Sequence, residues 1–371
     1  MLRNAKLIHI MALVVLAPAL ATLLLAGRST LEEHAAVVRL DAVAEVVESA
    51  GALSALVHEQ QKERGLTAGF IAGGGSVLRE ELRDQRRATD AALARLEAAA
   101  DGSAMSAELA GLAERARGLS AVRRQVDELS VAGPAAVGAY TSVNAAMLER
   151  IARWSRASGE ASLGARLAAY AAFLQAKEHA GLERAVGSAG FAGGFDAALH
   201  DRLVELGSAQ AAHLMAFHGT AEAEDAAALD ALAAGPAWAE VARLRSLALA
   251  GGPEAAGVSA ADWFAAATKR IEEMKRFEDG LADSLRANLA ELRASAGRAR
   301  LAGIGIALGA LTVSIAIAAF AATSLRRAVR ELVTAMGAIA SGDLDAPTPP
   351  ETANELGQAA GALRVLSLIH I

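Results

Sequence analysis

Two long apolar runs without a charged residue constrain the fold of this chain more than any other feature. The first run covers residues 7–27 and the second covers residues 301–323. A transmembrane helix needs about 20 predominantly apolar residues, and both runs meet that length. We therefore expect two transmembrane helices, with residues 28–300 folded on one side of the membrane and residues 324–371 on the other.

Basic residues beside the two runs indicate the orientation in the membrane. Arg3 and Lys6 lie in the short segment 1–6 ahead of the first run, and Arg326 and Arg327 follow the second run. Under the positive-inside rule, both flanking segments are cytoplasmic and the segment between the runs is extracytoplasmic. A cleaved signal peptide is the alternative for the first run, because a basic start followed by an apolar core suits both.

The composition predicts an all-α fold. The chain is 54% hydrophobic but only 4% aromatic, and it has 7 prolines among 371 residues. Alanine and leucine supply most of the apolar content, and both are strong helix formers. Between the two runs, apolar residues recur at helical intervals over about eight segments, which is too many for one four-helix bundle. We expect two stacked or nested four-helix bundles in residues 28–300.

Glycines and helix caps divide the predicted helices. Gly73–Gly75 ends the helix that leaves the first run. Ser259 is the expected N-cap of the last long helix, with Asp262 in its first turn. The expected helices run from the first apolar run to about residue 72 and then over residues 77–100, 105–131, 135–157, 160–191, 197–218, 222–234 and 260–340, with shorter pieces up to residue 249.

Charge and motifs exclude several classes of function. The net charge is −6 and no segment is strongly basic, so a nucleic-acid partner is not expected. The chain has no cysteine, which fits an oxidising compartment without disulfides. His179 and Glu183 share a helix face but lack a third metal ligand, so neither a metal nor another cofactor is expected. No set of nucleophile and base is evident, and an enzyme is the class that the sequence favours least.

Two related polar stretches are the candidate site. Glu63-Arg64 and Glu183-Arg184 are each followed by small residues, a phenylalanine and glycines. Guanidinium groups are planar, always charged and able to bind one edge of a planar anion through two N–H groups. We predict that Arg64 and Arg184 face each other across the bundle and hold a small anion. The alternative is that both are solvated and pair with nearby acids such as Glu59, Glu63, Glu178 or Glu183.

The residues around these arginines resemble the two motifs of the NIT domain. The resemblance rests on Gln61–Gly65, on Lys177 and Glu178, and on residues 182–185, with a third match at Asp262–Phe264 and Thr268. NIT domains are all-helical extracytoplasmic sensors of nitrate and nitrite. The resemblance implies a nitrate or nitrite ligand that contacts Arg64 and Arg184, and it makes Glu63, Gly65, Lys177 and Glu183 neighbours of the ligand site.

The segment after the second run resembles a HAMP domain. The resemblance rests on Ala340–Leu344 and Asn354–Gly357, although the proline usual in the first HAMP helix is absent. Two short amphipathic helices cannot bury their apolar faces alone, so we expect a homodimer. The sequence ends at Ile371 without an output domain, which predicts a truncated chain whose cytoplasmic signalling partners depend on a domain beyond it.

The resulting hypothesis is a transmembrane receptor of the chemotaxis type in the bacterial inner membrane, with a periplasmic sensor domain. Binding of the anion would shift the long helix that begins near residue 260 and pass that shift to the HAMP-like segment 324–371. Two alternatives stay open. One is the input half of a sensor histidine kinase or nucleotide cyclase, and the other is a membrane-tethered helical scaffold that binds a protein partner.

Overall fold

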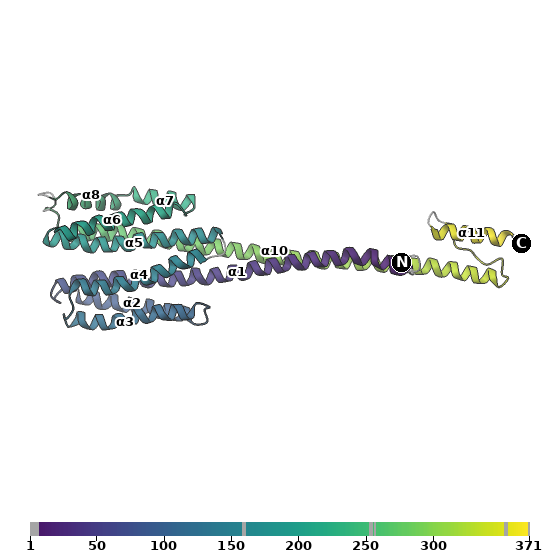
Figure 1. Ribbon diagram of the computed structural model, residues 1–371, viewed down its shortest axis with the longest axis horizontal. Helices are drawn as coiled ribbons and strands as arrows, with labels where there is room; N and C mark the ends of the chain where they lie inside the picture. Colours follow the sequence, from purple (N-terminus) through teal and green to yellow (C-terminus); the bar gives the residue numbers. More distant parts are fainter. Residues whose placement is uncertain (1–6, 158–160, 252–254, 256, 352–354, 370–371) are drawn as a thin grey trace. The chain divides into compact units, whose positions relative to one another are not determined.

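The computed structural model describes residues 7–157, 161–251, 255, 257–351 and 355–369, and the regular elements within these ranges are α-helices (Figure 1). This confirms the predicted all-α class. The helices are α1 (Leu7–Ala72), α2 (Arg79–Ala100), α3 (Ser106–Asp127), α4 (Gly133–Ala157), α5 (Ala161–Gly193), α6 (Ala197–His218), α7 (Ala223–Ala233), α8 (Pro236–Ala250), α10 (Ala260–Ala340) and α11 (Glu355–Ile369).

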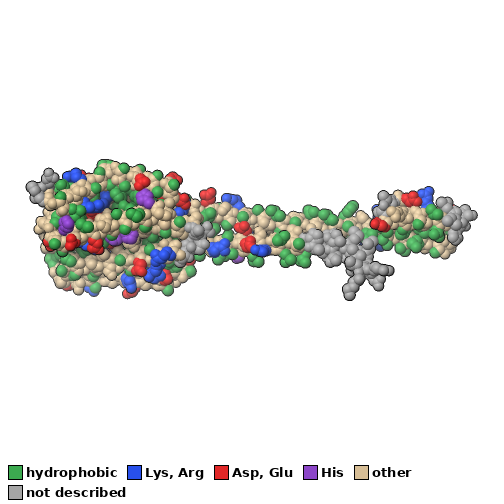
Figure 2. All heavy atoms as spheres, turned by 45° about the horizontal axis from the view of Figure 1, so that its top comes forward, with side chains coloured by type: hydrophobic (Ala, Val, Ile, Leu, Met, Phe, Trp, Pro, Cys, Tyr) green, Lys and Arg blue, Asp and Glu red, His purple; other side chains and the backbone are tan. Residues whose placement is uncertain are grey.

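The chain divides into two compact units. One unit is Val37–Ala294, and the other combines Met1–Ala36 with Ser295–Ile371. The first unit holds all of α2 to α8 together with the adjoining parts of α1 and α10. Figure 2 shows Lys and Arg side chains interspersed with Asp and Glu side chains over one face of this unit, as is typical of a solvated surface.

Within Val37–Ala294, helices α1 to α4 surround one core. Phe70 of α1, Leu82 of α2, Val126 of α3 and Ala136 of α4 form a buried cluster near the end of α1. The helix breaks directly after this cluster, where Gly74 and Gly75 adopt φ values of 60° and 77°. Glycine takes such left-handed conformations without the steric cost that a β-carbon brings, so the predicted helix stop lies where the chain turns.

Helices α5, α6, α8 and α10 surround a second core in the same unit. The rings of Phe173 (α5), Phe217 (α6) and Phe277 (α10) lie edge to face, with centroid separations between 4.8 and 5.9 Å. Val241 of α8 packs with Trp263 of α10 in a neighbouring buried cluster. Figure 1 shows α5 to α8 grouped on one side of this unit and α2 to α4 grouped on the other.

The start of α10 has the predicted cap. The backbone N–H of Asp262 donates to Ser259 Oγ at 3.1 Å, and Ser259 Oγ donates to the Asp262 carboxylate at 2.7 Å. This reciprocal bonding satisfies donors that a helix N-terminus leaves free. From this cap the helix continues without interruption to Ala340, as the sequence predicted.

One helix among the described residues is long and apolar enough to cross a membrane, namely α10, which contains an 18-residue window with a mean hydropathy of 2.3. Within it, Ile306, Val313, Ile315 and Phe320 are each more than half exposed. Exposed apolar surface of this extent marks a site of contact with a membrane or with another protein, and the membrane role of residues 301–323 stays a prediction. The predicted first span, residues 7–27, lies in α1, and its membrane role stays a prediction.

The second unit ends in α11, which is hydrogen-bonded to the connector that follows α10. Ala335 of α10 and Ala360 of α11 are buried, and Ser367 Oγ of α11 donates to the carbonyl of Leu344 at 2.7 Å. The chain between the two helices turns at Gly342, which has a φ of 93°. The predicted short helix after the proline-rich connector is therefore present.

Candidate functional site

The structure brings the two predicted arginines together. Arg64 of α1 and Arg184 of α5 line one cavity of about 350 Å³ between the two groups of helices. Only 3% of Arg64 and 8% of Arg184 is exposed, so neither arginine is solvated, but the pairing with a nearby acid that the alternative expected holds for Arg64, which pairs with Glu178. The remaining lining is small or apolar except for Gln61 and Ser188: Gly65, Ala68, Gly69, Ala72, Val137, Gly181, Ala185, Ala189, Ala192, Ala260 and Phe264.

Glycines let the two helices approach at this point. A β-carbon built on Gly65 of α1 would lie 3.0 Å from Nη2 of Arg184, and one on Gly181 of α5 would lie 3.1 Å from Nη2 of Arg64. Both separations are tighter than ordinary side-chain contacts. Each guanidinium therefore rests on a glycine of the opposite helix, and the absence of a side chain there is what admits it.

Arg64 has a partner of opposite charge. Its Nη1 donates to Thr141 Oγ1 of α4 at 2.9 Å and to the carboxylate of Glu178 on α5, and its Nη2 lies 3.4 Å from Glu178 Oε2. Gln61 Nε2 donates to the same carboxylate oxygen at 2.6 Å. The positive charge of Arg64 is thus offset by a buried carboxylate.

Arg184 has no such partner. Its Nη1 donates to Thr268 Oγ1 of α10 at 2.9 Å, and its guanidinium carbon lies 4.7 Å from the centroid of the Phe264 ring. Among the described residues, no carboxylate lies within 4.0 Å of its guanidinium nitrogens. Burial and the nearby charge of Arg64 lower the pKa of Arg184 to about 10. A buried cation without a counter-ion costs free energy, which an anion in the cavity would offset.

The glutamate before each arginine faces the opposite way, into the core of its own helix group. Glu63 accepts from Arg123 Nε and Nη2 at 2.7 Å each and from the Tyr140 hydroxyl at 2.6 Å. Burial together with the charge of Glu63 raises the pKa of Tyr140, so this phenol stays a donor. Consecutive helical residues point about 100° apart, which explains how one side chain faces the core and the next faces the cavity.

Glu183 repeats this arrangement in the second helix group. Its carboxylate is fully buried and accepts from Gln210 Nε2 at 2.7 Å, from Arg245 Nη2 at 2.9 Å and from Arg270 Nη2 at 2.8 Å. Burial alone would raise the pKa of Glu183, but the hydrogen bond from Arg245 and the charges of Arg270 and Arg245 outweigh it and lower that pKa. The donors come from α6, α8 and α10, so this one carboxylate ties three helices to α5.

Lys177 also lies outside the cavity. It is 1% exposed and forms an ion pair with Glu278 of α10, which in turn accepts from Ser54 of α1. Of the four residues predicted as neighbours of the ligand site, Gly65 lines the cavity. Glu63, Lys177 and Glu183 adjoin the arginines along the chain but hold the helices that carry them.

Several features of the cavity did not follow from the sequence. Phe264 is 40% exposed and lines the cavity, whereas its neighbour Trp263 is fully buried. Gly187, close to Arg184 along the chain, does not line the cavity, and a β-carbon there would collide with the Trp263 ring. Thr268 belongs to the third motif that resembles the NIT domain, so its place at the site could have been predicted. No sequence pattern marked Thr141.

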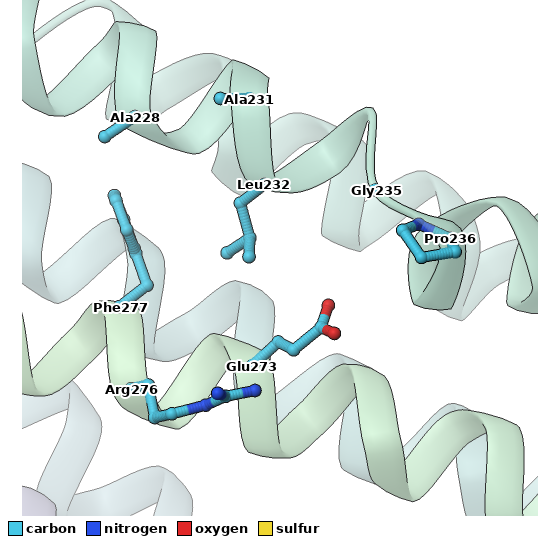
Figure 3. A pocket seen from close by; sticks show the side chains of 8 residues that line it. All are labelled: Ala228, Ala231, Leu232, Gly235, Pro236, Glu273, Arg276 and Phe277. Carbon is cyan, nitrogen blue, oxygen red and sulfur yellow. The ribbon is translucent and has the colours of Figure 1, made fainter.

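A larger hollow of about 550 Å³ lies elsewhere in the same unit, along α7, α8 and α10 (Figure 3). Its charged lining is one arginine, Arg276, and one carboxylate, Glu273, both on α10. In Figure 3, Leu232 of α7 and Phe277 of α10 extend into the space between the helices. The carboxylate makes this hollow a poorer anion site than the cavity that two arginines line.

Comparisons with known proteins agree with this geometry. The model of the family described as nitrate and nitrite sensing (NIT) matches residues 55–286, and the HAMP domain model matches residues 320–367. The nitrate regulatory protein of Klebsiella oxytoca is 30% identical over 238 residues, which are 62% of this chain and 60% of that relative. The chain thus spans less than two thirds of that relative's length.

A solved structure of the NasR transcription antiterminator superposes with a TM-score of 0.63 and 25% identity, covering 90% of this chain and 91% of that one. The NIT match alone spans more than half of the sequence, and it includes both arginines of the cavity. The chain therefore belongs to the NIT family of nitrate- and nitrite-sensing proteins and carries a HAMP domain after its NIT domain.

Proposed function

We propose that this chain is a transmembrane receptor that binds nitrate or nitrite between Arg64 and Arg184. The observation that carries the proposal is Arg184, a buried guanidinium that faces a cavity and has no carboxylate partner among the described residues. Nitrate and nitrite are small planar monoanions with acceptor oxygens, and they fit an edge of a guanidinium group. The proposal includes no catalytic step.

The electrostatics favour an anion at this position. At a separation of about 4 Å and an effective dielectric constant near 20, one unit charge pair interacts by about 4 kcal/mol before desolvation costs are subtracted. Arg64 and Arg184 carry like charges, and the charge of Arg64 is the second cause, after burial, of the lowered pKa of Arg184. An anion between them reverses the sign of that interaction, so bound and empty states favour different spacings of α1 and α5.

The long helix α10 offers a route for the signal. It carries Thr268 and Phe264 at the cavity, and the same unbroken helix includes residues 320–340 of the HAMP match. We propose that anion binding shifts α10 and that this shift reaches the HAMP domain. The two relatives are named a nitrate regulatory protein and a transcription antiterminator. These names support a sensor domain that is combined with different output domains.

The remaining parts of the proposal concern location, assembly and output. We propose an inner-membrane protein with spans at residues 7–27 and 301–323, a periplasmic NIT domain and a homodimeric HAMP unit. The apolar window in α10 supports the second span. A chemoreceptor output is the variant that we propose first, and a sensor kinase or cyclase output would leave the anion site unchanged.

Calorimetric titration of the full chain in lipid nanodiscs tests the anion site. We expect saturable heats for nitrate and nitrite and weaker heats for chloride, and we expect Arg184→Gln to abolish them. Arg83→Gln is the matched control, because Arg83 is an exposed arginine of α2 outside the cavity. Equal or absent heats for all three anions would remove the proposed ligand.

A further inference from the structure

Three charged side chains meet at the anion cavity. Arg64 and Arg184 are the charged residues among the described lining, and Glu178 lies directly behind Arg64, bonded to its guanidinium. Glu178 is 4% exposed, so solvent screens its charge little. Two positive charges and one negative charge leave the site with a net charge of +1.

The Glu178 carboxylate is built into the site. One oxygen accepts from Arg64 Nη1, and the other accepts from Gln61 Nε2 at 2.6 Å and lies 3.4 Å from Arg64 Nη2. Two oxygens that both accept from N–H donors match the bonding pattern of an ionised carboxylate. All these donors come from α1, whereas Glu178 belongs to α5, so the carboxylate sits on the same helix as Arg184.

The net charge determines which anions the cavity accepts at low cost. A monoanion brings the sum to zero. A dianion leaves one uncompensated negative charge in a buried site, close to the Glu178 carboxylate, and burying an unpaired charge is expensive. Arg64 Nη1 donates to both Glu178 and Thr141, whereas Arg184 donates to Thr268 among the side chains described, so Arg184 keeps more N–H groups for a ligand than Arg64 does.

We infer that Glu178 is a specificity-determining residue, which limits the cavity to one unit of positive charge and thereby selects monoanions over dianions. This inference rests on the proposed anion site. It assigns to Glu178 a role beyond holding Arg64 in place, because the carboxylate sets the charge that a ligand must balance.

The test compares nitrate with sulfate, a dianion of similar acceptor chemistry. Dissociation constants for both are measured by calorimetry on the full chain in nanodiscs, at matched ionic strength and without other binding anions. We expect the wild type to prefer nitrate and Glu178→Gln to raise the affinity for sulfate relative to nitrate by roughly tenfold or more. Glu272→Gln is the control, since it removes an exposed carboxylate near Arg184 that does not line the cavity.

Two further variants separate charge from packing. Glu178→Asp keeps the charge and should keep the preference for nitrate. Arg184→Gln lowers the net charge of the site to zero and should lose nitrate binding, whereas the double variant Arg184→Gln with Glu178→Gln returns it to +1 and should regain part of that binding. A purely structural role for Glu178 predicts no such rescue, because the second substitution would then only add damage.

The outcomes distinguish the inference from the proposal beneath it. If the wild type binds nitrate but Glu178→Gln leaves the ratio of the two affinities unchanged, the charge-selection role is wrong and the anion site stands. If the wild type binds neither anion, both fail. Should Glu178→Gln not fold, Glu178→Asp still decides, since a folded aspartate variant that keeps the charge but loses the preference for nitrate overturns the inference.

Discussion

At the scale of single residues, the site depends on a difference between two arginines in similar settings. Each donates to a threonine of the last helix in its own group, Thr141 for Arg64 and Thr268 for Arg184. Only Arg64 has a carboxylate within bonding distance among the residues described, namely Glu178. An anion should therefore stabilise the protein mainly through its contact with Arg184, the arginine without a carboxylate partner among the described residues.

Replacing Arg184 by methionine tests this dependence. The variant removes a buried, unpaired charge but keeps a long apolar side chain, so the protein without nitrate should melt no lower than the wild type. Nitrate should raise the melting temperature of the wild type and leave that of the variant unchanged. Thermal unfolding with and without nitrate measures both effects, and a nitrate-dependent rise in the variant would contradict the assigned role.

Replacing Glu183 by glutamine should damage the second helix group. The substitution leaves Arg245 and Arg270 without their shared carboxylate, and breaking a buried ion pair costs about 3–5 kcal/mol. Glu240→Gln breaks the solvent-exposed pair with Arg243 and should cost far less stability, because water screens that pair. Denaturant unfolding of both variants provides the comparison, and similar losses would mean that Glu183 does not organise its core.

His58 predicts a dependence of stability on acid pH. Burial first, and then the charge of Lys177, lower the pKa of His58 to about 3. The unfolded chain takes up a proton near pH 6.5 while the folded chain does not, so stability falls as the pH drops from about 6.5 toward 3, by at most about 1.4 kcal/mol per pH unit. The groups that act on His58 besides Lys177 are Glu278, Lys275 and Glu59.

The measurement is the free energy of unfolding between pH 7 and pH 4. We expect His58→Gln to reduce the slope of the free energy of unfolding against pH. His200→Gln, at an exposed position of α6, should leave the slope as it is in the wild type. Parallel slopes in all three proteins would show that His58 is not kept neutral by its surroundings.

At the scale of helices, the crossing of α1 and α5 positions the site. Gly65 and Gly181 let each helix approach the guanidinium of the other, while Gly187 receives the Trp263 ring. The sequence pattern identified a cluster of small residues around both arginines. It did not reveal which of them face the cavity, because that depends on how two helices far apart in the chain cross.

The substitution Gly65→Ala should weaken anion binding with little effect on stability. The new methyl group would press on Arg184 Nη2, the end of a flexible side chain that can move aside but then leaves its binding position. Gly118→Ala on α3 is the control, since open space surrounds it and alanine favours the helix by up to about 1 kcal/mol. Nitrate titration and thermal unfolding are measured on both variants. A large fall in the melting temperature of Gly65→Ala would mean that the substitution disturbs the fold and not only the position of Arg184.

At the scale of the whole molecule, the sequence allowed prediction of the all-α class, most helix limits, the NIT and HAMP domains and the meeting of Arg64 with Arg184. The all-α class and the helix limits follow from local periodicity and caps, the meeting of the arginines from a repeated dipeptide, and the two domains from the resemblance of short motifs to known families. The partners of the buried charges could not be predicted, since Glu63 meets Arg123 sixty residues away and Lys177 meets Glu278. Such pairs depend on packing between distant helices, which no local pattern records.

The membrane assignment makes a prediction at this scale. An arginine near the middle of a transmembrane helix costs about 3 kcal/mol on insertion, so Val313→Arg should leave residues after 324 on the periplasmic side in part of the molecules. Protease added to spheroplasts should then cut that segment. Val204→Arg, at an exposed position of α6, is the control. Unchanged protection of the segment in Val313→Arg would contradict a span at residues 301–323.

The reciprocal contact between guanidinium and glycine has a practical consequence. Since α1 supplies Arg64 with Gly65 and α5 supplies Arg184 with Gly181, neither helix group holds a complete site. A molecule in which one helix group is misfolded therefore does not bind the anion at all, rather than binding it more weakly. A partly misfolded preparation should show the normal affinity but fewer bound anions per chain. The fraction of chains that respond to the anion thus becomes a direct assay of sample quality for this protein.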